Sequence, residues 1–200
     1  MSRILLLLLS SSATLLVFGL WIPVKAAVAQ ELLALAWAES QARQTETRPW
    51  PWADTWPVAR MVLPELNRSM IVLEGSHGES LAFGPGRVVG GLPGEDPVII
   101  AGHRDTHFRQ LNELAPGSAI RLQGRDGQWQ DYRVEAARVV DSRREQIDTQ
   151  RFSPDTLLLV TCYPFESLDA GGPLRYVVTA RRQDPAPGNP LEQIDTVAGL

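Results

Sequence analysis

The stretch LLLVTCYP, residues 157–164, is the part of the sequence that decides the fold. Its first five residues form an apolar or β-branched run of strand length, and Pro164 has no N–H group to continue a central ladder. Cys162 is therefore predicted to stand where a buried strand ends. It is the only cysteine in 200 residues, which excludes an intramolecular disulfide and cysteine-rich zinc sites. A buried spectator, an intermolecular bridge or a reactive thiol remains open for it.

Similar short apolar runs, separated by glycine and proline, fill residues 58–182 and are typical of an all-β domain. We expect eight strands, near residues 59–63, 70–73, 81–83, 98–101, 119–122, 128–140, 157–161 and 174–181. This number of short strands favours a closed barrel or a sandwich. Between them, the apolar residues of 108–114 indicate one or two helical turns, and the polar stretch 141–154 is long enough to be a functional loop.

The N-terminal end is uncharged from Ile4 to Val24. As an α-helix this segment would be about 31 Å long, which matches a bilayer core of about 30 Å. We therefore predict a membrane anchor over residues 1–25. A cleaved signal peptide is the alternative, because the small residues at 27–29 resemble a cleavage site.

Residues 26–57 connect this anchor to the β-domain. Ala, Leu, Glu and Gln dominate residues 26–44, which predicts a juxtamembrane helix. The following RPWPWADTWP, residues 48–57, combines three prolines with three tryptophans. Proline forbids a regular helix there, so we expect an extended strap whose rings pack on the domain, with a membrane or partner contact as the alternative. Residues 183–200 are expected to be a flexible tail.

The net charge of the chain limits the kinds of macromolecule that it is expected to bind. The chain has a formal net charge of −4, and the first thirty residues hold only Arg3 and Lys25. The remainder, with 17 basic and 23 acidic side chains, is therefore mildly acidic. It has no basic surface of the kind that binds nucleic acid, so no nucleic-acid partner is expected.

A reactive thiol needs a neighbouring base, because a thiol at the ordinary pKa of about 8.5 is only about 3% thiolate at neutral pH. The chain contains three histidines: His77, His103 and His107. His103 follows the β-type run 98–101 and Gly102, so it also stands at a strand end, whereas His77 lies in a glycine-flanked turn. Arg175, on the last predicted strand, would most simply be a solvated residue, yet its permanent donors also suit a developing oxyanion.

Two other interpretations of the histidine segment are weaker. His103 and His107 could chelate a metal with Asp105 if the segment were helical, but a β-type run precedes it and a convincing third ligand is missing. His103-Arg104-Asp105 also matches part of a kinase catalytic loop. No asparagine follows at the required spacing and no glycine-rich nucleotide loop is present, so this match is accidental.

Three stretches, in this order along the chain, resemble the sortase family of cysteine transpeptidases. They are WPWADTWPVAR at 50–60, GHRDTHF at 102–108 and TCYPF at 161–165, with an arginine thirteen positions after the cysteine. More narrowly, they are similar to the branch found in Gram-negative bacteria, called class GN or marine proteobacterial type. The resemblance implies an all-β, eight-stranded sortase-type barrel with short helical insertions, here preceded by an N-terminal transmembrane helix.

The resemblance also implies the site and its chemistry. Cys162 would be the nucleophile, His103 the acid/base partner, and Arg175 the group that holds the oxyanion and the substrate backbone, with Thr161 as a further substrate contact. No cofactor and no metal are implied. The reaction would cleave a sorting signal resembling Leu-Pro-x-Thr-Gly through a thioester and transfer the acyl group to an amine.

The partners implied are an envelope or secreted protein that bears the sorting signal, an amine acceptor that the sequence does not identify, and the lipid bilayer. The location implied is the inner membrane, crossed once, with the catalytic domain facing the periplasm. Two alternatives stay open: a thiol hydrolase that trims an envelope protein, and a noncatalytic barrel that serves as an envelope scaffold.

Overall fold

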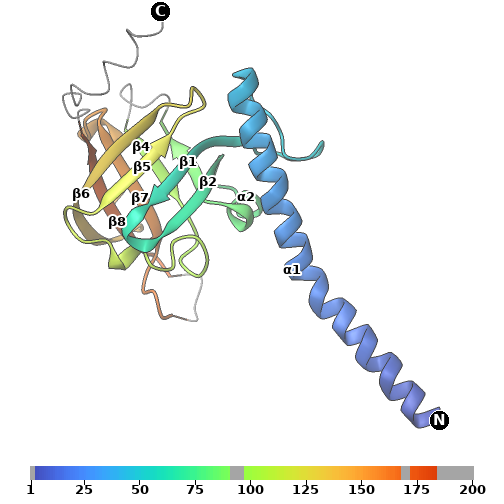
Figure 1. Ribbon diagram of the computed structural model, residues 1–200. Helices are drawn as coiled ribbons and strands as arrows, with labels where there is room; N and C mark the ends of the chain where they lie inside the picture. Colours follow the sequence, from blue (N-terminus) through green and yellow to red (C-terminus); the bar gives the residue numbers. More distant parts are fainter. Residues whose placement is uncertain (1–2, 91–96, 168–171, 184–200) are drawn as a thin grey trace, which may run out of the picture.

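The computed structural model describes residues 3–90, 97–167 and 172–183. Eight strands close into a barrel in the order β1-β2-β3-β4-β7-β8-β6-β5, which confirms the predicted all-β barrel (Figure 1). The strands are β1 (Pro57–Leu63), β2 (Arg68–Glu74), β3 (Gly86–Val89), β4 (Val98–Ala101), β5 (Ala119–Gln123), β6 (Trp129–Asp141), β7 (Thr156–Cys162) and β8 (Leu174–Arg182). The helices are α1 (Arg3–Arg43) and α2 (Gly78–Phe83), with 3-10 turns η1 (Pro64–Leu66), η2 (Leu111–Glu113) and η3 (Thr149–Arg151).

β7 lies inside the sheet, parallel to β4 on one side and antiparallel to β8 on the other. Leu157 and Leu159 belong to the apolar cluster inside the barrel, whereas Leu158 packs in a second cluster on the opposite face of the sheet. A strand covered on both faces is apolar at every position rather than at alternate ones. This explains why residues 157–160 form an uninterrupted apolar run, as predicted, up to the strand end at Cys162.

One predicted strand is wrong. Residues 81–83 form the last turn of α2, in which the Ser80 hydroxyl donates to the His77 carbonyl oxygen at 2.9 Å. Three apolar residues are too few to show a period, so a strand and a helix cannot be distinguished there. The missing strand is β3, which pairs parallel to β2 and antiparallel to β4.

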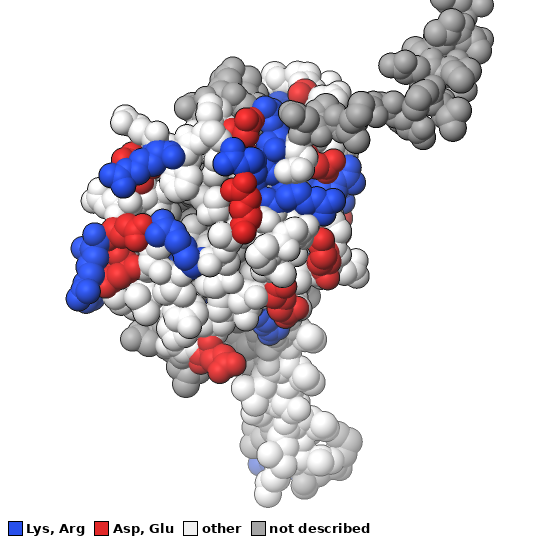
Figure 2. Space-filling view, turned by 90° about the vertical axis from the view of Figure 1, so that its left-hand side faces the viewer, with Lys and Arg blue, Asp and Glu red and all other residues white. Residues whose placement is uncertain are grey.

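α1 is one continuous helix that includes both the predicted anchor and the predicted juxtamembrane helix. Its first half is long and apolar enough to cross a membrane, is exposed, and extends away from the barrel (Figure 1). Figure 2 shows that this protruding half is almost uncharged, whereas the barrel surface carries many charged side chains. The second half packs on the barrel through a stripe at helical spacing: Ala29, Leu33, Ala36, Trp37 and Ser40 are buried.

The proline- and tryptophan-rich strap packs on the domain over most of its length. The Trp50 ring meets the Phe83 ring of α2 edge-on, with centroids 5.1 Å apart. The buried Thr55 donates its hydroxyl hydrogen to the Glu74 carbonyl oxygen at 2.7 Å. Among the three tryptophans of the strap, Trp52 is the exception, because 82% of its surface is exposed.

The remaining sequence expectations concern connections. The helical turn predicted within 108–114 is present as the 3-10 turn η2, and Phe108, Leu111 and Leu114 are buried. Residues 142–155 connect β6 to β7 and include η3. The predicted flexible tail falls outside the described residues from residue 184 onward.

Leu33→Ala should lower the free energy of unfolding by about 2–5 kcal/mol, because Leu33 is 1% exposed at the contact between α1 and the barrel. The measurement is unfolding of the full-length protein in detergent, followed by tryptophan fluorescence. Leu35→Ala is the matched control, since Leu35 on the same helix is 66% exposed. Equal losses in the two variants would contradict the packing described for α1.

Candidate active site

The end of β7 and the end of β4 lie side by side. In their parallel register Ala101 is the partner of Val160, and the Gly102 N–H donates to the Val160 carbonyl oxygen at 3.0 Å. The backbone pairing of the two strands reaches Gly102, one residue before His103, and Cys162 is the last residue of β7, so His103 and Cys162 stand at the same edge of the sheet. The His103 side chain is exposed and Cys162 is half-buried, so both are open to a substrate.

Thr161 links the end of β7 to the residue that follows β4 by a buried hydrogen bond. Its side chain is 2% exposed, and its hydroxyl group donates to the Gly102 carbonyl oxygen at 2.7 Å. Gly102 itself has no room for a larger residue, because an added Cβ would lie 2.7 Å from the Phe108 ring. The backbone between β4 and His103 is therefore held from both sides.

Arg175 is the direct partner of Cys162 across the antiparallel pair of β7 and β8. Side chains of directly opposed residues leave the sheet on the same face, with Cβ atoms about 4.5–5.5 Å apart. The Arg175 Nη1 donates to the carbonyl oxygens of Gly172 at 2.6 Å and Leu174 at 2.9 Å. The structure thus brings the three residues predicted as catalytic to the same end of three adjacent strands.

Alternation along the strands places these residues on the outer face of the barrel. Leu158 and Val177 pack with Ile99 in the apolar cluster opposite the barrel interior. The two-residue period carries that face on to Cys162 in β7 and to Arg175 in β8. A peptide could therefore reach the thiol along the outside of the sheet without entering the packed barrel.

The long loop between β6 and β7 covers part of that outer face. Its residues Ile147 and Phe152 pack against the cluster that contains Leu158 and Val177. The predicted loop thus forms an apolar wall next to the strands that carry Cys162 and Arg175.

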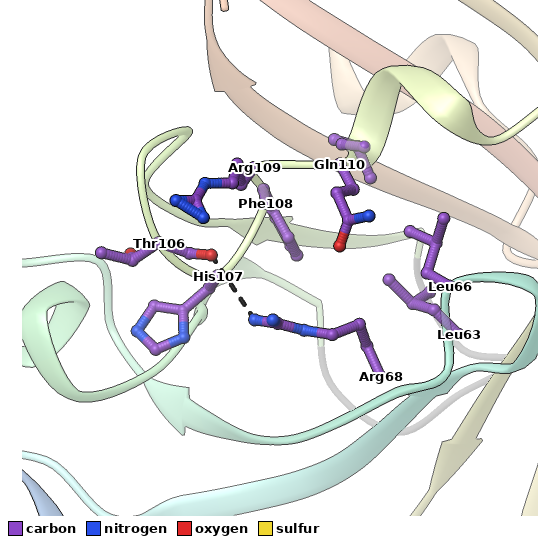
Figure 3. Close-up of a pocket in the computed structure, with 9 residues that line it drawn as sticks. Leu63, Leu66, Arg68, Thr106, His107, Phe108, Arg109 and Gln110 are labelled. Carbon is purple, nitrogen blue, oxygen red and sulfur yellow. Dashed lines mark hydrogen bonds between the residues drawn. The ribbon is translucent and has the colours of Figure 1, made fainter.

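His107 lies in the same loop as His103, in a small pocket between that loop and the beginning of β2 (Figure 3). The Arg68 side chain reaches across this pocket and donates to the Thr106 carbonyl oxygen at 3.5 Å. Burial lowers the pKa of His107, the positive fields of Arg68 and His103 lower it further, and a hydrogen bond with the backbone of Ala82 opposes them. His107 is therefore neutral at physiological pH.

Arg104 is a site residue that the sequence did not reveal. It is 4% exposed, its Nη1 donates to the Pro164 carbonyl oxygen at 2.7 Å, and its Nη2 donates to the Ser167 carbonyl oxygen. The Nε donates to Asp105, whose carboxylate is 70% exposed. One guanidinium therefore ties the loop after β4 to the loop after β7. Its position next to a candidate histidine was the only signal in the sequence.

Comparison with known proteins decides the family. The family model described as "Sortase domain" matches residues 61–183, which include every residue of the site described above. The chain belongs to the sortase family. Sortase D of Bacillus subtilis (strain 168) is 32% identical over 122 residues, which are 60% of this chain and 61% of that protein.

Solved sortase structures have the same barrel. Sortase C-1 from Actinomyces oris matches with a TM-score of 0.54 and 29% identity, over 64% of this chain and 76% of that chain. Sortase C from Clostridium perfringens, solved with the C-terminal cell wall sorting motif, matches with a TM-score of 0.54 and 19% identity, over 80% of this chain and 90% of that chain. The second likeness shows the fold alone. Sortases are cysteine transpeptidases that process sorting signals.

The match with the sortase domain begins at Met61, inside β1. Helix α1 and the strap therefore lie outside the matched segment, although both pack on the barrel. The chain also spans less than two thirds of the Bacillus subtilis relative.

Arg104→Lys should lower the free energy of unfolding by about 1–3 kcal/mol, because an ammonium group cannot reach both loop carbonyls and at least one charge-assisted hydrogen bond of the buried side chain is lost. Urea unfolding of the two proteins measures the difference. Arg109→Lys changes an exposed arginine of the same loop and should alter stability by no more than about 0.5 kcal/mol. An Arg104→Lys protein as stable as the Arg109→Lys protein would show that the clamp contributes nothing.

His107 should contribute a pH-dependent part of the stability. Its pKa is lowered on folding, so the unfolded chain binds the proton more readily. The contribution is present above the ordinary pKa of 6.5 and is lost as the pH falls through the folded-state pKa. His107→Gln should therefore flatten the fall in melting temperature between about pH 7.5 and about pH 5. The exposed His77 provides the control variant, His77→Gln.

Proposed function

We propose that this protein is a membrane-anchored cysteine transpeptidase that cleaves a sorting signal resembling Leu-Pro-x-Thr-Gly and transfers the acyl part to an amine. The observation that carries the proposal is the convergence of His103, Cys162 and Arg175 at one end of β4, β7 and β8. The match to the sortase domain over residues 61–183 supports the same chemistry.

In the first half of the proposed reaction, the Cys162 thiolate attacks the threonine carbonyl carbon of the signal. A carbon–sulfur bond forms and the carbonyl oxygen becomes an oxyanion. Arg175 donates hydrogen bonds to that oxyanion, and such a donor contributes about 3–4 kcal/mol in comparable sites. His103 protonates the glycine nitrogen, and the carbon–nitrogen bond breaks. The amine is released, and the acyl group stays on Cys162 as a thioester.

In the second half, an incoming amine attacks the thioester carbonyl. His103 accepts the proton that the amine loses, the new amide bond forms, and the Cys162 thiolate leaves. Arg175 again holds the oxyanion. Within residues 3–90, 97–167 and 172–183, the acceptors that Arg175 contacts are the neutral carbonyl oxygens of Gly172 and Leu174, so its guanidinium can also donate to an anionic intermediate.

The predicted substrate contact of Thr161 stays a prediction. Its hydroxyl group is buried and donates to Gly102, which supports a role in positioning the backbone before His103. Arg104 also supports a positioning role, because it binds the Pro164 carbonyl oxygen and so links the loop of His103 to the loop after β7.

We propose that α1 is a retained anchor rather than a cleaved signal peptide. One helix runs from Arg3 to Arg43 without interruption, and its first half has the length and composition of a membrane span. Ala29, the last small residue before the alternative cleavage site, is already buried against the domain. A peptidase would therefore have to open packed helix to cut there.

The inner membrane, the periplasmic orientation and the Gram-negative branch enter this proposal through the motifs at 50–60, 102–108 and 161–165. The substrate would then be an envelope or secreted protein that bears the sorting signal. Transfer to water instead of an amine would make the enzyme a hydrolase that trims the same target.

Cys162→Ala and His103→Ala should each abolish cleavage of a fluorogenic sorting-signal peptide, because each removes a group that touches the reacting atoms. Arg175→Ala should lower kcat/KM by about 10²–10³ through the lost oxyanion donor. His107→Ala, whose side chain lies in a separate small pocket, should reduce activity much less. Full activity in the Cys162→Ala protein would refute the proposal.

Product analysis separates transfer from hydrolysis. With the wild-type protein, added hydroxylamine should divert the acyl part of the peptide into the hydroxamate and release the Cys162 thiol, because the thioester is intercepted before water reacts. Mass spectrometry of the products with and without the amine makes the measurement. Exclusive formation of the free acid at saturating amine would favour the hydrolase.

A further inference from the structure

The barrel packs on the second half of α1 in one orientation, and this orientation determines which end of the barrel is nearer the apolar half of the helix. We propose that the end of the barrel that carries Cys162 faces the lipid bilayer, and that helix α1 fixes the site at the level of the lipid headgroups. The proposal rests on the membrane anchoring proposed above and adds to it the direction and the height of the site.

Hydrogen bonds along α1 give the direction in which the helix crosses the barrel. Near the middle of α1, the Gln30 Nε2 donates to the Phe83 carbonyl oxygen at the end of α2, at 2.8 Å. At the C-terminal end, the Gln44 Nε2 donates to the carbonyl oxygen of Arg125 at 3.0 Å. Arg125 lies in the turn between β5 and β6. The helix therefore passes from α2 to the β5–β6 turn as its residue number rises.

Strand pairing shows that the β5–β6 turn is at the end opposite Cys162. β5 begins near η1, where the Ala119 N–H donates to the Glu65 carboxylate at 2.8 Å, and it runs from there toward the turn. The same end of the barrel holds the pocket in which Leu63 meets the loop that follows His103 (Figure 3). β5 thus starts at the end that carries the site and finishes at the opposite end.

α2 is on the side of the site. The backbone of Ala82 forms a hydrogen bond with His107, four residues after His103. From its contact with Arg125 back to its contact with Phe83, α1 therefore runs toward the end of the barrel that carries Cys162. The exposed apolar half of α1 continues in the same direction. Figure 1 shows the loops of this end on the side toward which the N-terminal half of α1 extends.

The height follows from the rise of an α-helix. Gln30 is six residues beyond Val24, where the uncharged stretch ends, which corresponds to about 9 Å along the helix axis. The contact between Gln30 and α2 is thus only about 9 Å beyond the apolar span. The described parts of the loops after β4 and β7 lie on the side toward which the N-terminal half of α1 extends, which sets them at the level of the lipid headgroups (Figure 1).

A site at this level suits a substrate that is itself attached to the bilayer. A peptide segment leaving the membrane reaches the thiol along the outer face of β4, β7 and β8 without rising into the bulk solvent. A freely soluble peptide has to enter the narrow space between the domain and the lipid. Tethering also raises the effective concentration, provided that the two sites are at matching heights.

The geometry can be measured without any catalysis. In full-length protein carrying Cys162→Ala, a single cysteine is introduced by Arg109→Cys in the loop after His103, or by Gln128→Cys at the β5–β6 turn; both positions are exposed. A fluorescent donor on each is combined with vesicles that contain headgroup-labelled acceptor lipid. Energy transfer should be clearly greater from position 109 than from position 128. Equal or reversed transfer would overturn the proposed direction.

The effect of the height of the site on cleavage is tested by lengthening α1, which moves the barrel away from the membrane. Seven additional Ala, Glu and Lys residues after Lys25 lengthen the helix by about 10 Å and nearly preserve its rotational phase. Cleavage of a membrane-tethered sorting signal should fall at least about tenfold, and cleavage of the same signal as a soluble peptide should not change. The same seven residues placed before Ile4, on the other side of the membrane, are the control.

The outcomes separate this proposal from the one on which it rests. Unchanged cleavage of the tethered signal by the raised protein overturns the membrane-facing site but leaves the transpeptidase intact. Failure of the wild-type protein to cleave either form of the signal overturns the proposed function itself, and the energy-transfer measurement then still decides the direction of the barrel.

Discussion

The parallel pairing of β4 with β7 is the constraint on which the site depends. Parallel strands end at the same edge of a sheet, so the residues that follow them emerge together. Here the Gly102 N–H bonds to Val160, and the Thr161 hydroxyl bonds to Gly102, which carries the pairing past the end of β4. Because side chains alternate with a period of two, a slip of one residue would turn Cys162 into the barrel. The fully buried β7 side chains on both faces prevent that slip.

A buried charge reinforces this junction. Arg104 has lost most of its water, and the carbonyl oxygens of Pro164 and Ser167 offset that loss. Both acceptors belong to the chain just after Cys162, so the guanidinium joins the two loops that leave the paired strands. Displacing the two carbonyl groups would be costly, because the guanidinium would stay buried without those acceptors.

The sequence predicted those parts of the fold whose signal is local. The apolar runs in β4 and β7, and the residues that end them, were sufficient to place His103 and Cys162 at strand ends. Residues 81–83 failed because three apolar residues have no period, and tertiary packing made them helical. Arg104 could not be recognised because the acceptor that explains its burial, Pro164, is 60 positions away. Its role depends on the closed barrel, not on its neighbours in sequence.

α1 contains both the proposed membrane span and the stripe that packs on the barrel. Because both belong to one helix, the distance and the tilt between the membrane and the barrel are fixed. A flexible linker between a span and a domain would leave the distance and the tilt of the domain unset. In this chain the stripe from Ala29 to Ser40 is buried on the barrel, while the same helix continues into the apolar half. The phase of the stripe fixes which side of the barrel meets the helix, and its position along the helix fixes the height. A change in either would move the site relative to the membrane without altering a single catalytic residue.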